Sequence, residues 1–534
     1  MSGLRYMAPG TPIPHDGVVY RSRASVLITG DTVSAADAAR ELARRAPSLR
    51  IALFAPGVAA LGDLPTTVKA VGGRIVSLRG HLGRFSASVR VAVDKAEDAG
   101  IFSGNADRHF DLVLDLRREP LFRQSVLPHG YYAPGDDPAA LAQALDSLPQ
   151  LTGDFHKPKY VDYRPQLCAH GAMGVAGCRR CLDVCATQAI RSSGEKIEVD
   201  AYLCQGCASC TLACPTGALG FQHPAPGTLQ ELLDEGLEKR GEIAPGPILV
   251  VYDAEARHLL PFTEAPGALF LEVNPLPAFS DLLWLKALAA GVGGLVLVLA
   301  ATTPPQSRQL IEFKLKGLRT ILAGLGLDPE VLRIAVPRDV PTAIEQIVRL
   351  PALTAPAADL AVDGKQGSLL ALIDALGSGG PTDGRSNAPR ALAVGATFGA
   401  VLVDTGKCSL CLACTHLCPT GALNGQLDPA PQLSFTESRC IQCDLCRAGC
   451  PEQAIALQPR FLPDPIARNA ARELASDRLA ACSNCGTPFI GRRKLALSLA
   501  LMQEHAPDTP GAGDSLQMCP NCRQRETMLE MGFR

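Results

Sequence analysis

The chain has 534 residues, of which 47% are hydrophobic and 19% are charged, and its formal net charge is −2. At the usual size of roughly 100–200 residues, this length predicts about three to five domains. The near-neutral charge excludes the basic character of most nucleic-acid-binding proteins, so no nucleic-acid partner is expected. All 20 cysteines lie in clusters at 168–214, 408–450 and 482–522. In a chain of this size such clusters predict metal ligands, not disulfides.

Residues 1–150 predict a small α/β domain with a connector at its end. A helix is expected at 34–45, where Ser34 and Asp37 fit a capping box. Gly30 precedes it without a G-x-G-x-x-G pattern, so no dinucleotide-binding loop is expected. Strands are expected at 25–29, 51–54, 74–78, 86–91 and 111–116. Residues 1–11 lack the apolar core of a signal peptide, and the sequence therefore predicts a cytoplasmic protein.

Residues 151–225 hold the first eight cysteines. The second half of this region has the spacing C-x2-C-x2-C-x3-C-P, which is the bacterial ferredoxin signature. The residues are Cys204, Cys207, Cys210, Cys214 and Pro215. The first half departs from this spacing, with nine residues after its first cysteine and Ala186 in place of proline; its cysteines are Cys168, Cys178, Cys181 and Cys185. The glycine-rich insert 169–177 is expected to loop out and to return Cys168 to the other three.

Residues 245–350 predict a second α/β domain. Helices are expected at 279–290 and 306–325, and strands at 247–252, 269–273, 295–300 and 332–336. The apolar stretch 282–303 has the composition of a membrane span, but Lys286 and three glycines interrupt it. We therefore expect a helix, a turn and a buried strand there, and no membrane span. Residues 351–395 are expected to be a linker, flexible over 377–389.

Residues 396–460 repeat the ferredoxin spacing twice. The two runs are Cys408, Cys411, Cys414, Cys418 with Pro419, and Cys440, Cys443, Cys446, Cys450 with Pro451. The hexapeptide CPTGAL occurs at 214–219 and again at 418–423. The two modules are therefore expected to share one template.

In this spacing three cysteines wrap around one cluster and the fourth ligates the neighbouring cluster. Sixteen cysteines then form four [4Fe–4S] sites. Site one is Cys168, Cys178, Cys181 and Cys214, and site two is Cys204, Cys207, Cys210 and Cys185. Site three is Cys408, Cys411, Cys414 and Cys450, and site four is Cys440, Cys443, Cys446 and Cys418. Zinc is the alternative, but zinc sites usually pair two C-x2-C knuckles and do not use triplets.

Residues 461–534 carry the last four cysteines. Cys482 and Cys485 form one knuckle, Cys519 and Cys522 form another, and a helix is expected at 493–505 between them. This is zinc-ribbon spacing, so one structural zinc is expected, with a mononuclear iron or a fifth cluster as the alternative. The region is expected to cap a domain or to dock a partner.

Two resemblances extend this interpretation. The segments 129–137, 168–185, 203–219, 482–489 and 518–523 together resemble a family of large proteobacterial 4Fe–4S ferredoxin-type proteins associated with formate dehydrogenase. The segments 279–298 and 315–334 resemble the small iron–sulfur subunit of methyl-viologen-reducing hydrogenase. No cysteine lies between 215 and 407, so the [2Fe–2S] site of that subunit is not expected.

The sequence thus predicts a multi-domain α/β chain with two α+β ferredoxin-like modules, two small α/β domains and a C-terminal zinc-ribbon-like knuckle. Thiolate-saturated clusters leave no open coordination position, so the predicted function is electron transfer to redox protein partners, without catalytic residues of its own. The resemblance implies formate dehydrogenase as a partner. The alternatives are a reductase with a substrate or nucleotide site in an α/β domain, and a dehydrogenase assembly or docking factor. The α/β domains are expected to space the two modules.

Overall fold

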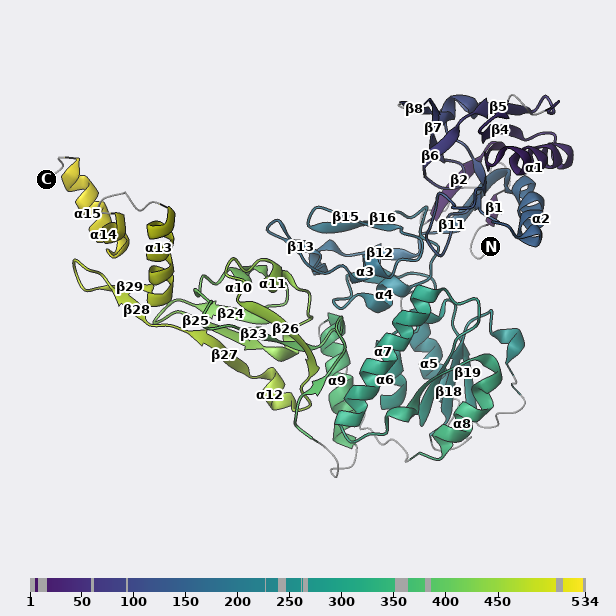
Figure 1. The fold of residues 1–534 in the computed structure, drawn as a ribbon. Helices are drawn as coiled ribbons and strands as arrows, with labels where there is room; N and C mark the ends of the chain where they lie inside the picture. The colour runs from purple at the N-terminus through teal and green to yellow at the C-terminus, as the bar shows by residue number, and fades with distance from the viewer. Residues whose placement is uncertain are drawn as a thin grey trace.

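The computed structural model describes residues 5–7, 17–58, 62–92, 95–225, 227–238, 246–260, 262, 268–350, 364–379, 386–505 and 512–531. Figure 1 shows a mixed α/β chain in which the first cysteine-rich module lies between the N-terminal and the central α/β domains. The second module follows, and a hairpin with three helices extends from it to the C-terminus. No helix in the described part of the chain is long and apolar enough to cross a bilayer.

The N-terminal domain is built on a parallel sheet in the order β10-β9-β3-β4-β5. Its strands are β3 (Ser25–Gly30), β4 (Arg50–Ala55), β5 (Val68–Gly72), β9 (Leu112–Leu116) and β10 (Tyr131–Tyr132). Helices α1 (Thr32–Arg45) and α2 (Pro138–Ser147) contribute to the core on one face. The antiparallel strands β6 (Arg74–Arg79), β7 (Ser86–Ala92) and β8 (Lys95–Asp98) form a second sheet, and Ile75 and Val89 from it pack with Leu27 of β3.

This domain extends past its expected end at 150. Strand β11 (Gly153–Pro158) pairs with β1 (Arg5–Met7) and with β2 (Gly17–Ser22), and it leads directly into the first module. The pairing joins the two ends of the domain in one sheet.

The capping box predicted at Ser34 and Asp37 is wrong. Helix α1 begins one turn earlier, with Asp31 as its N-cap, and the Asp31 carboxylate accepts hydrogen bonds from the backbone N–H groups of Val33 and Ser34 at 3.0 Å each. Asp and Ser are comparable N-cap residues, so the sequence does not choose between them. Strand β3 ends at Gly30, directly before Asp31, and this favours Asp31 as the cap.

The two modules have equivalent architectures. In module one, β12 (Val161–Tyr163) pairs with β17 (Leu219–Phe221), and β15 (Ile190–Ser193) with β16 (Lys196–Val199). In module two, β23 (Gly399–Val403) pairs with β26 (Ile455–Phe461), and β24 (Leu423–Gln426) with β25 (Gln432–Thr436). The short helices are α3 (Arg180–Asp183) and α4 (Ser209–Ala213) in module one, and α10 (Ala413–Leu417) and α11 (Leu445–Ala448) in module two. This equivalence agrees with the repeated hexapeptide.

Module two is larger than the predicted span 396–460. Strand β22 (Arg390–Ala391) pairs with β26 before that span, and β27 (Ala471–Ser476) pairs with β25 after it. Helix α12 (Pro465–Asn469) connects the last two strands.

The central domain is a parallel sheet in the order β19-β18-β20-β21, with helices on both faces. The strands are β18 (Ile248–Tyr252), β19 (Ala268–Glu272), β20 (Gly294–Val298) and β21 (Leu332–Ala335). Helices α5 (Thr228–Glu238), α6 (Asp281–Ala289) and α7 (Pro305–Gly324) share a core with one face, and α8 (Val340–Val348) covers the other. The predicted strands and helices of this domain agree with these elements within two residues.

The linker predicted at 351–395 is wrong over 364–379. Helix α9 (Gly364–Gly379) occupies this stretch and packs against α6, because Leu369, Ile373 and Leu376 are buried in the core of the central domain. Glycine and serine at its ends suggested flexibility, but the apolar residues between them bury a helix face. Residues 380–385 of the predicted flexible segment lie outside the described residues.

The sequence suggested that the central domain holds the two modules apart, but the central domain instead packs against both. Its core continues into both, through Leu212 of α4 and through Phe398 and Phe461 of module two. Each such buried side chain stabilises the assembly by about 1.5–3 kcal/mol. Both modules are therefore anchored to one body.

The C-terminal region begins with the hairpin of β28 (Leu479–Ala481) and β29 (Pro488–Gly491). Helices α13 (Arg492–His505), α14 (Ala512–Leu516) and α15 (Pro520–Glu530) follow. Helix α13 agrees with the helix predicted at 493–505.

Candidate metal centres

The sixteen module cysteines come together in four groups, and these are the four predicted sets. Three of the groups line small cavities: Cys168, Cys178, Cys181 and Cys214; Cys408, Cys411, Cys414 and Cys450; and Cys418, Cys440, Cys443 and Cys446. In the remaining group, burial and three neighbouring thiols raise the pKa of Cys210 well above its usual range. Those thiols belong to Cys207, Cys204 and Cys185.

The regular cysteine runs share one backbone device. In each run, the residues on both sides of the middle cysteine have left-handed φ values, from 53° to 77°. These flanking residues are Gly206 and Ala208, Leu410 and Leu412, and Gln442 and Asp444. A non-glycine residue in this conformation costs roughly 1–2 kcal/mol. Successive N–H groups in such a turn point into a concavity that favours an anion, so the loops are preformed for bound thiolates and sulfides.

The fourth cysteines receive additional donors. In three of the sets a threonine hydroxyl lies two residues after the cysteine, at 3.5–3.7 Å from its sulfur. The pairs are Thr187 with Cys185, Thr216 with Cys214, and Thr420 with Cys418. Backbone N–H groups also donate to sulfur, from Ala189 to Cys185 at 3.2 Å and from Ala454 to Cys450 at 3.4 Å. Donors of this kind stabilise negative charge on sulfur and tune a bound cluster.

The irregular half of module one uses a different device. The insert folds into a hairpin of β13 (Gly171–Ala172) and β14 (Val175–Ala176), which returns the chain to the cysteine group. Cys178 N–H donates to the carbonyl of Ala169 at 3.1 Å, and this bond closes the hairpin beside Cys168. His170 is buried and lies 2.8 Å from the Cys178 carbonyl and 2.7 Å from the Ser192 hydroxyl. The insert therefore brings Cys168 back to the other three cysteines of its set, and the two contacts of His170 hold the hairpin in place.

The two modules contact each other at sites one and four. A Cβ added to Gly177 would lie 2.5 Å from Leu445 Cγ, so the backbone of module one packs directly against a side chain of module two here. The Arg180 guanidinium donates to the carbonyls of Ile441 at 3.0 Å and Gln442 at 3.1 Å. Arg180 follows two residues after Cys178 of site one, and both carbonyls belong to the loop of site four.

Electrostatic neighbours give the order of the four sites. Burial and the thiols of its own set raise the pKa of Cys210 in site two, and Cys181 of site one raises it further. Burial raises the pKa of Cys443 in site four to about 12, and Cys178 of site one adds to this. Burial also raises the pKa of Cys446 in site four, with a contribution from Cys414 of site three. The sites therefore lie in the order two, one, four, three.

The two ends of this series differ in exposure. Cys411 of site three is exposed at the surface. Site two instead lies beneath the N-terminal domain, where fully buried Lys157 donates from Nζ to the Cys204 carbonyl. The Lys157 ammonium lies 5.6 Å from the ring of Tyr20 and 5.7 Å from that of Tyr160. Burial lowers the pKa of Lys157 to about 8.

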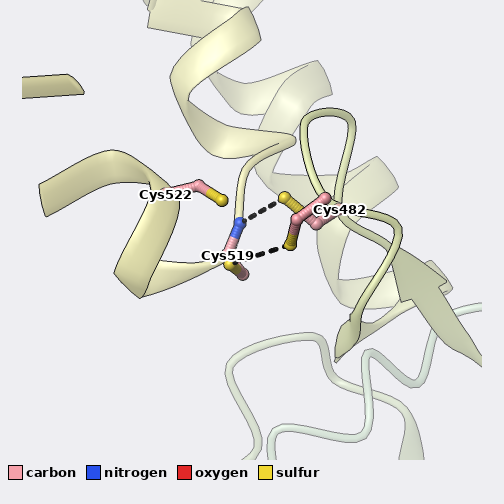
Figure 2. A group of neighbouring side chains, drawn as sticks. Cys482, Cys519 and Cys522 are labelled. Atoms are coloured by element: carbon pink, nitrogen blue, oxygen red, sulfur yellow. Dashed lines mark hydrogen bonds between the residues drawn. The ribbon is translucent and has the colours of Figure 1, made fainter. Parts of the chain in front are cut away.

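The last four cysteines form a compact group of their own. Their four sulfurs all lie within 4.8 Å of one another. Figure 2 shows Cys482 on the hairpin side, opposite Cys519 and Cys522 at the start of α15. The Cys519 N–H donates to Cys482 Sγ at 3.2 Å. Burial opposes ionisation of Cys482, but backbone N–H groups, first that of Cys519, outweigh it and lower the Cys482 pKa to about 6.

Comparison with known families supports the chemistry of the two modules. Residues 176–218 and residues 407–455 each match a family described as a 4Fe–4S dicluster domain. The first match begins after Cys168, so the place of Cys168 rests on the hairpin geometry. No curated protein shows significant similarity to the chain. The chain thus carries two dicluster ferredoxin domains, and an iron–sulfur electron-transfer role fits them.

Proposed function

We propose that the chain is an electron-transfer protein in which four [4Fe–4S] clusters form one continuous relay. The carrying observation is the direct contact of the two modules, which brings sites one and four together. The donor sets fit the clusters, because each set offers four thiols, and the regular loops turn N–H groups toward them. Each bound cluster would supply one-electron exchange.

In this proposal the protein residues hold the clusters in series and shield the inner ones. Sites one and four form the interior of the relay, and site two is enclosed by the N-terminal domain. Site three, with exposed Cys411, is the place where a redox partner exchanges electrons. The resemblance of the chain implies formate dehydrogenase as that partner.

We also propose that Cys482, Cys485, Cys519 and Cys522 bind one zinc ion. A tetrahedral zinc with Zn–S distances of about 2.3 Å places its sulfurs about 3.8 Å apart. The sulfurs of Cys485 and Cys519 lie 3.7 Å apart. This agreement, together with a low pKa at Cys482, fits a closed structural site that stabilises the C-terminal region.

Metal and sulfide analysis of anaerobically purified protein tests the proposal. We expect about sixteen iron and about sixteen acid-labile sulfide per chain, with about one zinc. A reproducible value near eight iron would contradict a four-cluster relay.

A partner experiment tests the proposed redox partner. Co-purification with a formate dehydrogenase, followed by formate-dependent reduction of the clusters, would support the partner. Stable association without electron flow would instead indicate an assembly or docking factor. Stoichiometric binding of NAD(P) or a flavin to the chain would favour the reductase alternative.

A further inference from the structure

A buried ionic group lies where the central domain meets the two modules. Asp281 stands at the start of α6 and its side chain is 4% exposed. Lys314 of α7 approaches it at 2.8 Å, and Lys365 of α9 at 3.3 Å. Both lysine side chains are 11% exposed. Three helices from separate parts of the chain therefore place two ammonium groups and one carboxylate together in the interior.

The charges in this group do not balance. Lys365 directs its other hydrogen bonds to the carbonyls of Thr211 and Leu212, at 3.1 and 3.0 Å, and not to an acid. Within the described ranges, Asp281 is the one carboxylate that contacts either ammonium group. The Arg180 guanidinium adds a third cation nearby, because it donates to the Ala396 carbonyl at 3.0 Å and Ala396 lines the same cavity as Asp281 and Lys314. Burial lowers the Lys314 pKa, and the charge of Arg180 adds to this lowering. An uncompensated buried charge is strongly unfavourable, so these cations favour a further negative charge nearby.

The proposed cluster at site one would supply that negative charge. Arg180 lines the cavity that is surrounded by the four site-one cysteines. Lys365 lies beside Pro215 and Thr216, which directly follow Cys214. A cluster with four thiolates carries net negative charge, which grows by one unit when the cluster takes up an electron. The excess cations therefore face the group that would compensate them.

We propose that Arg180, Lys314 and Lys365 form an electrostatic bed that stabilises the reduced form of site one, with Asp281 limiting its strength. This inference rests on the proposed cluster at site one. Reduction adds one electron to that cluster, and the fixed cations offset the added charge without a proton. Site one then acts as an electron-holding position inside the relay.

Two substitutions of opposite sign test the bed. Lys365→Met removes a cation and leaves Lys314 paired with Asp281, so the reduction potential of one cluster should fall. Asp281→Asn removes the anion and should raise the same potential. Each change is expected to alter the ratio of reduced to oxidised site one by about tenfold at fixed ambient potential, or about 59 mV for one electron. Potentiometric titration followed by electron paramagnetic resonance measures this shift.

Matched controls separate charge from structural damage. Lys365→Arg keeps the charge and should leave the potential unchanged. Lys316→Met removes an exposed lysine from α7, the helix that carries Lys314, and should also leave the potential unchanged. Unfolding or disorder would not give shifts of opposite sign. If Lys365→Met fails to retain iron, Asp281→Asn decides the matter with the same readout.

The outcomes distinguish this inference from the proposed function. Wild-type protein without clusters would refute the proposed function. Clusters present in full, with Asp281→Asn unchanged or shifted to lower potential, would overturn the electrostatic bed alone.

Discussion

Gly177 is the position at which a single methyl group tests the contact between the modules. Its added Cβ would lie 2.5 Å from Leu445 Cγ, 2.9 Å from Leu445 Cδ2 and 3.0 Å from the Cys443 carbonyl oxygen. Carbon atoms in contact normally stay about 3.5–4.0 Å apart, so Gly177→Ala must displace the facing segment of module two by about 1 Å. Leu445 is fully buried, so it cannot turn toward solvent to relieve this contact.

Overpacking of this kind typically costs about 1–3 kcal/mol. Gly177 does not have a left-handed φ, so alanine introduces no backbone strain there. The expected result is a lower unfolding temperature together with slower electron equilibration between the modules, because electron tunnelling weakens steeply with distance. Freeze-quenched paramagnetic resonance after partial reduction follows the equilibration, and thermal unfolding follows the stability.

Gly317→Ala is the matched control for this experiment. Gly317 lies within α7, and an added Cβ there would meet nothing within 4 Å. Alanine in a helix interior stabilises by about 0.5–1 kcal/mol relative to glycine, so this variant should be slightly more stable with unchanged electron transfer. A Gly177→Ala protein with wild-type stability and wild-type equilibration would refute direct packing of the modules at this point.

Three further substitutions address single sites. Cys168→Ser should remove or convert the cluster of site one alone, seen as a loss of about one to four iron per chain; unchanged iron and spectra would defeat its assignment. Glu437 is buried, which raises its pKa, but Arg460 and Arg472 outweigh this and hold the pKa below its ordinary value. The stabilisation is therefore complete above the unfolded pKa of about 4.3 and is lost as the pH falls through the folded value. Glu437→Gln should cost about 1–3 kcal/mol at pH 7, because both arginines keep some contact with solvent, and it should flatten the acid dependence of the unfolding temperature. An equally steep acid dependence would exclude this role. Cys522→Ser should abolish zinc binding without loss of iron, whereas zinc retained in full would speak against the C-terminal site.

Much of the fold follows from local sequence patterns. The runs ILVVY and GLVLV are fully buried in β18 and β20, and continuous apolar runs of this length are typical of parallel strands. Helix α9 was missed because glycine and serine flank it, and only its packing on α6 makes its apolar face informative. The start of α1 was missed because Asp31 and Ser34 are equally good caps, and the end of the preceding strand decides between them.

The cysteine groups were predictable because ligand spacing is a local property of the sequence. The contacts that order and tune the groups are not local. Arg180 reaches carbonyls more than 260 residues away in the chain, and Lys365 reaches carbonyls more than 150 residues away. Lys157 reaches the Cys204 carbonyl across the junction of two domains. No spacing rule connects such positions. The sequence offered one partial signal, the two arginines between Cys178 and Cys181, but it did not indicate which of them makes the contact or with what.

Electron paramagnetic resonance of the fully reduced protein tests the four-cluster relay most directly. Adjacent reduced clusters couple magnetically, so the contact between sites one and four should broaden and split the spectrum across both modules. The account predicts a coupled spectrum that integrates to about four unpaired spins per chain. A spectrum that equals the sum of isolated clusters, or that integrates to about two spins, would contradict it.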